Sequence, residues 1–149
     1  MEINWEIKSF QELNTTELYQ IVQLRIDIFM LEQNCFYRDL DNKDFPSNHL
    51  MGWHQDTLVA YARLLPPSIS YEECSIGRVL VHRDFRKFGL GKQLMLQAIA
   101  FLSPPSTPQP IRISAQLYLQ RFYEDLGFVP TGDEYLEDDI PHIQMLRPS

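Results

Sequence analysis

Residues 86–91 read Arg-Lys-Phe-Gly-Leu-Gly and lie between an apolar run and a segment with helical periodicity. Glycines at the start of a helix let the backbone approach a ligand closely, and the unpaired N–H groups there bind anions. Arg86 and Lys87 can add charge-assisted hydrogen bonds to a phosphate. The segment therefore predicts a pyrophosphate site, although a tight strand-to-helix turn alone would account for the same glycines.

Thiol and metal chemistry have weaker support. Cys35 and Cys74 have no CxxC spacing and no neighbouring histidine, so we interpret them as reduced thiols in a reducing compartment. His49 and His54 lack a cysteine or carboxylate partner at a metal-site spacing. We therefore expect no metal and no cysteine nucleophile.

Composition narrows the class of protein. The chain has 149 residues, is 44% hydrophobic and carries a net charge of −7. This length predicts a single domain over residues 1–149. The acidic balance argues against a nucleic-acid partner, and no apolar run is long enough to span a bilayer. Charges near the N-terminus interrupt any secretory h-region, so we expect a cytoplasmic protein with no membrane partner.

Hydrophobic periodicity and turn-forming residues predict the helices and strands that position these residues. Asn14 can cap the first helix, and Gly127 can terminate the last. The predicted helices are 14–32, 91–102 and 118–126, the predicted strands are 49–53, 58–65, 75–81, 111–116, 128–130 and 142–146, and residues 34–48 form a loop beside the substrate. This order predicts an α/β (α+β layered) domain with a mixed sheet.

Two motifs in this order carry a resemblance. An Arg-x-x-Gly-x-Gly loop opens a helix, and after the next strand come Phe122, Tyr123, Gly127 and Phe128. This arrangement resembles the GNAT superfamily of N-acetyltransferases. Residues within 24–41, at 49–50 and in the tail 135–142 are similar to the ElaA-like branch, so the resemblance covers nearly the whole chain. It implies a mostly antiparallel central sheet flanked by helices.

The resemblance also implies an activity, the transfer of an acetyl group from acetyl-CoA to an amine by direct attack on the thioester. The strand residues would pair with the pantetheine arm, the loop would hold the pyrophosphate, and Gln116 stands where many members carry asparagine. The implied cofactor-binding residues are Val79, Leu80, Val81, Arg86, Lys87, Phe88, Gly89, Leu90, Gly91, Lys92 and Gln116. A non-catalytic CoA-binding or regulatory module with the same fold remains the alternative.

Three residues are candidates for proton transfer. Tyr123, at the position of the superfamily's tyrosine, would protonate the leaving thiolate, unless it only packs between helix and sheet. Glu32 at the end of the first helix and His142 at a strand start are equal candidates for the base. A solvated glutamate and a structural histidine are the alternatives.

Acidic residues suggest the nature of the acceptor. If the 34–48 loop and the C-terminal tail flank the cleft, their carboxylates form a negative funnel that favours a cationic amine. Otherwise they only keep the protein soluble. Asp139 also replaces a glycine that is common in ElaA-like tails. The residues of the expected funnel are Asp39, Asp41, Asp44, Glu134, Glu137, Asp138 and Asp139. A homodimer is compatible with the sequence, but no pattern specifies one.

Overall fold

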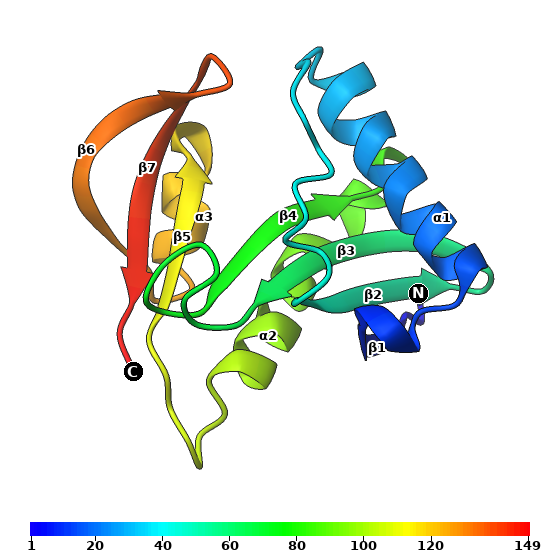
Figure 1. The fold of residues 1–149 in the computed structure, drawn as a ribbon, viewed down its shortest axis with the longest axis horizontal. Coiled ribbons are helices and arrows are strands. Elements are labelled where there is room, and N and C mark those ends of the chain that lie inside the picture. The colour runs from blue at the N-terminus through cyan, green and yellow to red at the C-terminus, as the bar shows by residue number, and fades with distance from the viewer.

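The computed structural model describes residues 1–149, which form two antiparallel sheets and three α-helices (Figure 1). The first sheet has the order β1-β2-β3-β4, and the second has the order β5-β7-β6. The strands are β1 (Asn4–Ser9), β2 (Asn48–His54), β3 (Thr57–Leu65), β4 (Ser75–Val81), β5 (Ile111–Gln116), β6 (Val129–Glu137) and β7 (Ile140–Arg147). The α-helices are α1 (Thr15–Arg25), α2 (Leu90–Leu102) and α3 (Gln120–Glu124), η2 (Ile26–Glu32) is a π-helix, and the 3₁₀ helices are η1 (Phe10–Glu12), η3 (Arg83–Phe88) and η4 (Leu117–Leu119). The predicted fold class is confirmed.

Two helices cover opposite faces of the first sheet. Successive strand residues point to opposite faces, and the neighbours Leu50 and Met51 of β2 belong to different core clusters. Leu50 packs in the cluster that holds Leu94 and Ala98 of α2, whereas Met51 packs in the cluster that holds Ile21 of α1. β3 is buried on both sides, so this sheet is a rigid base for the loops at its ends.

The sequence explains how the first helix begins. Asn14 accepts a hydrogen bond from the Glu17 amide, and Glu17 accepts one from the Asn14 amide, which completes a capping box. The predicted helix 14–32 is not uniform, because the chain changes to a π-helix over Ile26–Glu32. π-Helical turns of this kind occur frequently at functional sites. Phe29, which lies in the π-helix, lines the main cavity described below.

The two sheets meet at one end and separate at the other. Cys74 forms a parallel bridge with Ile111, and the Arg112 amide donates to the Cys74 carbonyl over 3.0 Å. Beyond this point β4 pairs only with β3, while β5 pairs only with β7, so the facing edges of β4 and β5 diverge (Figure 1). The open edge of β4 therefore borders a gap between the sheets.

The main differences from the predicted elements lie at the termini and at α3. The edge strand β1 was not predicted, and β6 extends to Glu137 through a polar sequence that did not indicate a strand. The predicted helix 118–126 is shorter, since a 3₁₀ turn precedes α3. Gly127 follows α3 with a φ of 95°, as expected for a residue that terminates a helix. None of the helices combines the length and the apolar character needed to cross a membrane.

Candidate functional site

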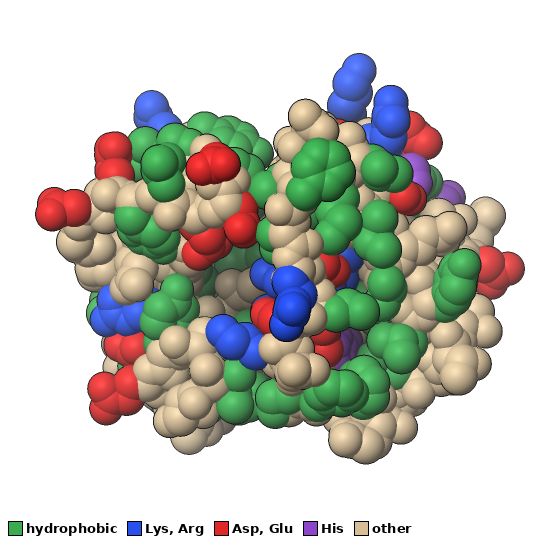
Figure 2. All heavy atoms as spheres, turned by 45° about the horizontal axis from the view of Figure 1, so that its top comes forward, with side chains coloured by type: hydrophobic (Ala, Val, Ile, Leu, Met, Phe, Trp, Pro, Cys, Tyr) green, Lys and Arg blue, Asp and Glu red, His purple; other side chains and the backbone are tan.

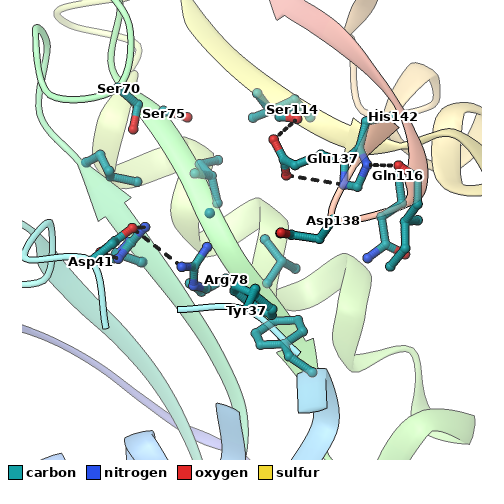
Figure 3. A pocket seen from close by; sticks show the side chains of 18 of the residues that line it. Tyr37, Asp41, Ser70, Ser75, Arg78, Ser114, Gln116, Glu137, Asp138 and His142 are labelled. Atoms are coloured by element: carbon teal, nitrogen blue, oxygen red, sulfur yellow. Dashed lines mark hydrogen bonds and ion pairs between the residues drawn. The ribbon is translucent and has the colours of Figure 1, made fainter. Parts of the chain in front are cut away.

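A cavity of about 600 Å³ lies where β4 and β5 diverge. Its walls come from β4, from the ends of β5 and β7, from Tyr123 and from the loop over residues 33–47. The space-filling view shows this hollow near the centre of the molecule (Figure 2), and the close-up shows polar side chains entering it from both sheets (Figure 3). Of the site residues predicted from the sequence, Val79, Gln116, Tyr123 and His142 line this cavity.

A β-bulge interrupts β4 at the cavity. Tyr61 pairs with Leu80 and Arg63 pairs with Gly77, so the single residue Ala62 lies opposite two residues of β4. One of these, Arg78, has a φ of 50°, a left-handed conformation that is uncommon for a residue with a side chain. Bulges of this kind bend a strand and redirect its side chains. Here the bulge turns Arg78 and Val79 toward the cavity.

The start of α2 presents unpaired N–H groups. Gly89 has φ 70° and ψ 20°, and no side chain caps the helix. The amides of Leu90, Gly91 and Lys92 make no backbone hydrogen bond, as expected for the first turn of a helix. A Cβ on Gly91 would lie 3.8 Å from the Phe122 ring, so the helix start lies directly beside α3. This geometry fits the predicted anion site.

The other predicted cofactor-binding residues have varied surroundings. Val79 lines the main cavity, whereas Leu80 points to the opposite face and packs in the α1 cluster. Leu90 is buried, and Phe88 is 52% exposed beside Phe85. Val81 accepts a hydrogen bond on its carbonyl from Arg86 Nε, over 3.2 Å. The side chains of Val79 and Phe88 are therefore accessible to a bound cofactor. Leu80 and Leu90 can contact it only through their backbone groups.

Glu32 and Arg86 form a two-point ion pair. Arg86 Nη2 donates to Glu32 Oε2 over 2.9 Å, and Arg86 Nη1 donates to the other oxygen. This hydrogen bonding lowers the pKa of Glu32 and raises the pKa of Arg86. Glu32 lines a separate, smaller cavity with His82 and Arg83 rather than the main one. Lys87 and Lys92 form no ion pair and are the unengaged cations of the loop.

Tyr123 lies on the wall of the main cavity. The residue is only 7% exposed, and burial raises the pKa of its hydroxyl to about 12. Its ring makes edge contacts with Phe122 and Phe128, at centroid distances of 5.1 and 5.9 Å. No group of the chain forms a hydrogen bond with the hydroxyl, although Tyr123 lines the cavity. The phenol is therefore protonated at neutral pH and available to a ligand.

His142 and Gln116 lie side by side on paired strands and both line the cavity. His142 Nδ1 lies 2.7 Å from the Ile140 carbonyl, which can only accept, so this nitrogen carries a proton. The other ring nitrogen, Nε2, lies 3.4 Å from Glu137 Oε2. Figure 3 shows these side chains grouped on the β5–β7 side of the cavity. Glu137 also accepts from Ser114 Oγ over 3.3 Å.

The expected negative funnel is wrong for the 33–47 loop, because its aspartates are paired with arginines. Arg25 is 1% exposed and donates to Asp39 Oδ2 (2.9 Å) and Asp44 Oδ1 (2.7 Å). Arg63 donates to both oxygens of Asp41, over 2.8 and 3.1 Å. Burial alone would raise the pKa of Asp41, but the hydrogen bonds and charge of Arg63 lower it to about 2.

Arg78 completes this network. Its Nε donates to Asp39 Oδ1 over 2.9 Å, and its Nη2 donates to the Asp39 carbonyl over 3.0 Å. The aspartates therefore fix the loop to β3 and β4 instead of attracting a cation. Sequence reasoning missed Arg78 and Lys43, which both line the cavity, because no local pattern predicts a left-handed arginine in a strand or pairs residues so far apart in the chain.

No group of three or more histidine, cysteine or acidic residues lies close enough together to hold a metal ion. His49, one of the residues considered as a ligand, is 1% exposed and has both ring nitrogens engaged. Its Nε2 donates to the Asp44 carbonyl over 3.0 Å, and its Nδ1 lies 2.6 Å from the Tyr61 hydroxyl. Burial lowers the pKa of His49, so this ring is neutral and structural.

Comparisons with known proteins agree with this architecture. Residues 24–147 match the acetyltransferase (GNAT) domain family. Protein ElaA of Escherichia coli is 40% identical over 147 residues, which cover 97% of this chain and 96% of that protein. The crystal structure of Escherichia coli ElaA superposes with a TM-score of 0.91, at 39% identity, over 98% of this chain and 99% of that chain.

A second solved structure is equally informative. An acyl-CoA N-acyltransferase from Pseudomonas aeruginosa is 42% identical and has a TM-score of 0.88, and the match covers 98% of this chain and 99% of that chain. The family match and the ElaA relative both span most of the chain, and the resemblance inferred from the loop and tyrosine motifs is confirmed. The chain belongs to the GNAT acetyltransferase family, in the ElaA-like branch, and is an acyltransferase.

Proposed function

We propose that this protein transfers an acetyl group from acetyl-CoA to a primary amine of a small molecule or peptide. One observation carries the proposal: the open edge of β4 and Tyr123 border one cavity, and the unpaired amides at the start of α2 lie beside Phe122, the neighbour of Tyr123. The Phe122 ring packs edge-on against the Tyr123 ring, so α3 connects the proposed pyrophosphate site to the proposed proton donor.

The residues present fit acetyl-CoA. The amides of Leu90, Gly91 and Lys92 suit a pyrophosphate, and Lys87 and Lys92 supply positive charge that no carboxylate of the chain neutralises. The open edge of β4 over 78–81 can pair with the amide groups of a pantetheine arm as with an added strand. When bound, acetyl-CoA supplies the activated acetyl group.

Tyr123 would act as the general acid. The amine forms its bond to the acetyl carbon while the carbon–sulfur bond breaks, and the Tyr123 hydroxyl gives its proton to the departing sulfur. Its pKa of about 12 keeps the proton in place until the thiolate forms. Burial next to Phe122 and Phe128 keeps water from competing for the same proton.

His142 is the better supported of the two candidate bases. It lines the cavity that holds Tyr123, and Glu137 lies 3.4 Å from its Nε2, where the carboxylate can stabilise an imidazolium. Glu32 lines the other cavity and is held by Arg86, which lowers its pKa and makes it a weak base. We therefore assign proton removal to His142 with Glu137 and assign to Glu32 only the ion pair with Arg86.

A thermal-shift measurement with CoA, followed by thiol release from acetyl-CoA across a panel of amines, tests the proposal. A ligand at 100 times its Kd stabilises a protein by about 2.7 kcal/mol, which raises the Tm of a chain of this size by roughly 5–10 °C. Stabilisation with amine-dependent thiol release supports the enzyme. Stabilisation with no thiol release for any amine would indicate the non-catalytic CoA-binding module instead.

Gly91→Val is the matched variant for the binding step. Gly91 lies in regular helix and its Cβ would meet only the Phe122 ring at 3.8 Å, so the fold tolerates a side chain there. The added methyl groups would block the approach of a pyrophosphate to the helix amides, and we expect the CoA-dependent rise in Tm to disappear. A folded variant with an unchanged rise would remove this helix start from the cofactor site.

A further inference from the structure

The main cavity has two walls of opposite charge. We call the side formed by Lys43, Ser70 and Arg78 the lysine wall, and the side formed by Ser114, Glu137 and Asp138 the carboxylate wall; both line the cavity. Figure 3 shows Ser70 and Arg78 on the first-sheet side, facing Ser114, Glu137 and Asp138 on the second-sheet side. Figure 2 shows acidic side chains on the β6–β7 side of the hollow and basic side chains on its opposite and lower rim.

Lys43 carries a charge that the chain does not neutralise. Its Nζ donates to Ser70 Oγ over 3.0 Å, and no carboxylate of the chain lies within ion-pair distance of it. An ammonium has three N–H donors, so this contact leaves two of them available. Ser70 therefore holds the ammonium at the edge of the cavity without using up its capacity to bind an anion.

Arg78 adds a second donor group on the same wall. Its Nε and Nη2 bind Asp39 and Asp41, but its Nη1 makes no hydrogen bond in the chain. The guanidinium is 20% exposed and lines the cavity. The left-handed backbone at the β4 bulge places it there, since an ordinary strand would alternate its side chains differently.

The charges of the lysine wall do not cancel. The arginines and aspartates that support it balance one another, with Arg25, Arg63 and Arg78 opposite Asp39, Asp41 and Asp44. Lys43 therefore leaves one net positive charge at this end of the cavity. Arg38, which also lines the cavity and forms no ion pair, increases this positive charge.

The carboxylates of the carboxylate wall are not balanced by arginine or lysine side chains. No arginine or lysine pairs with Glu137 or Asp138, and the ring of His142 is the neighbour of Glu137, at 3.4 Å. Gln116 and Tyr123 line the same part of the cavity, where the amine must arrive in the proposed reaction. An ammonium is attracted to this end, whereas a second positive charge at the far end of the acceptor would meet Lys43.

We propose that the acceptor carries a carboxylate as well as its amine, as an amino acid does, with the amine at the carboxylate wall and the carboxylate bound by Lys43 and Arg78 Nη1. The inference rests on the proposed function and names its substrate class. A cavity of about 600 Å³ is large enough for an amino acid beside the reacting end of a cofactor. The two walls then act as a charge-matched pair that orients the acceptor.

The test compares kcat/KM for amino acids with kcat/KM for their α-carboxamides. Loss of a charged hydrogen bond corresponds to about a 10- to 100-fold effect, so we expect the acid to be preferred by that factor. The carboxamide has the less basic amine, and more of it is unprotonated at a given pH, so amine basicity works against the expected result. A preference for the acid therefore reports on carboxylate recognition.

Lys43→Gln assigns the effect to the lysine wall. We expect the preference for the acid to fall to within about threefold, and an unchanged Tm of the variant would confirm an intact fold. Arg121→Gln removes an exposed cation that lines neither cavity and should keep the full preference. Loss of the preference in both variants would indicate a net-charge effect and overturn the assignment.

Two further outcomes separate this inference from the proposed function. Equal kcat/KM for acid and carboxamide, or a clear preference for a diamine of similar length, would overturn the carboxylate site and leave N-acetyl transfer intact. An absence of thiol release with every amine, despite stabilisation by CoA, would overturn the proposed function and this inference together.

Discussion

The two sides of the cavity use acidic residues in opposite ways. In the 33–47 loop, Asp39 and Asp44 are buried and bound by arginines, so they act as structural anchors of the loop. At the β6–β7 turn, Asp138 and Asp139 have no arginine or lysine partner. Aspartates therefore stabilise the 33–47 loop on one side of the cavity and create a negative potential on the other side. The difference arises because arginines lie close to the aspartates of the loop and not to those of the β6–β7 turn.

The largest effect on stability should come from breaking the anchored side. Arg25→Ala leaves Asp39 and Asp44 buried without their main partner, so we expect a loss of about 3–5 kcal/mol in the free energy of unfolding, measured with urea. Arg38→Ala is the matched control, because Arg38 is exposed and forms no ion pair. Its effect should stay within about 0.5 kcal/mol. Equal losses in the two variants would show that the network is not the anchor.

Low pH should lower the free energy of unfolding by weakening the ion pair between Asp41 and Arg63. The pKa of Asp41 is lowered from 3.8 to about 2, so its contribution is fully present above about pH 4 and is lost as the pH falls toward 2. The shift corresponds to about 2 kcal/mol. Asp41→Asn should remove that part of the decrease between pH 5 and pH 2.5 in urea unfolding. An identical pH profile in the variant would contradict the pairing with Arg63.

Much of the arrangement follows from local patterns, and the remainder depends on long-range pairing. Residues 58–65, 75–81 and 111–116 are apolar enough to predict β3, β4 and β5, and glycines identify the start of α2. β1 was missed because it is a half-buried edge strand without a clean alternation. The fate of the loop aspartates was missed because Arg25 and Arg63 lie 14 and 22 residues from their partners Asp39 and Asp41.

A smaller effect should appear at the ion pair between Glu32 and Arg86. Glu32→Gln frees Arg86 for a phosphate and removes a nearby negative charge, so CoA should bind more tightly by about 1 kcal/mol, roughly fivefold in Kd. Calorimetry with CoA measures this change, and kcat should remain unaltered. A large fall in kcat with unchanged CoA affinity would instead support the role of Glu32 as the base.

The smallest effect concerns the turn on the unpaired side. Asp138 and Asp139 have φ values of 50° and 64°, between the paired residues Glu137 and Ile140, which is the geometry of a two-residue hairpin that favours glycine in the second position. Asp139→Gly should raise the free energy of unfolding by about 0.5–1 kcal/mol. Asp139→Ala should lower it, and a gain in both variants would show that backbone conformation is not the cause.

In the proposed reaction Tyr123 donates the proton to the departing sulfur, so Tyr123→Phe removes the general acid. The variant keeps the ring that packs against Phe122 and Phe128 and removes only the hydroxyl. We predict that kcat for thiol release falls by roughly 10²- to 10⁴-fold while the Kd for CoA changes by less than about twofold. Activity within a factor of two of the parent protein would contradict this account and make Tyr123 a core residue.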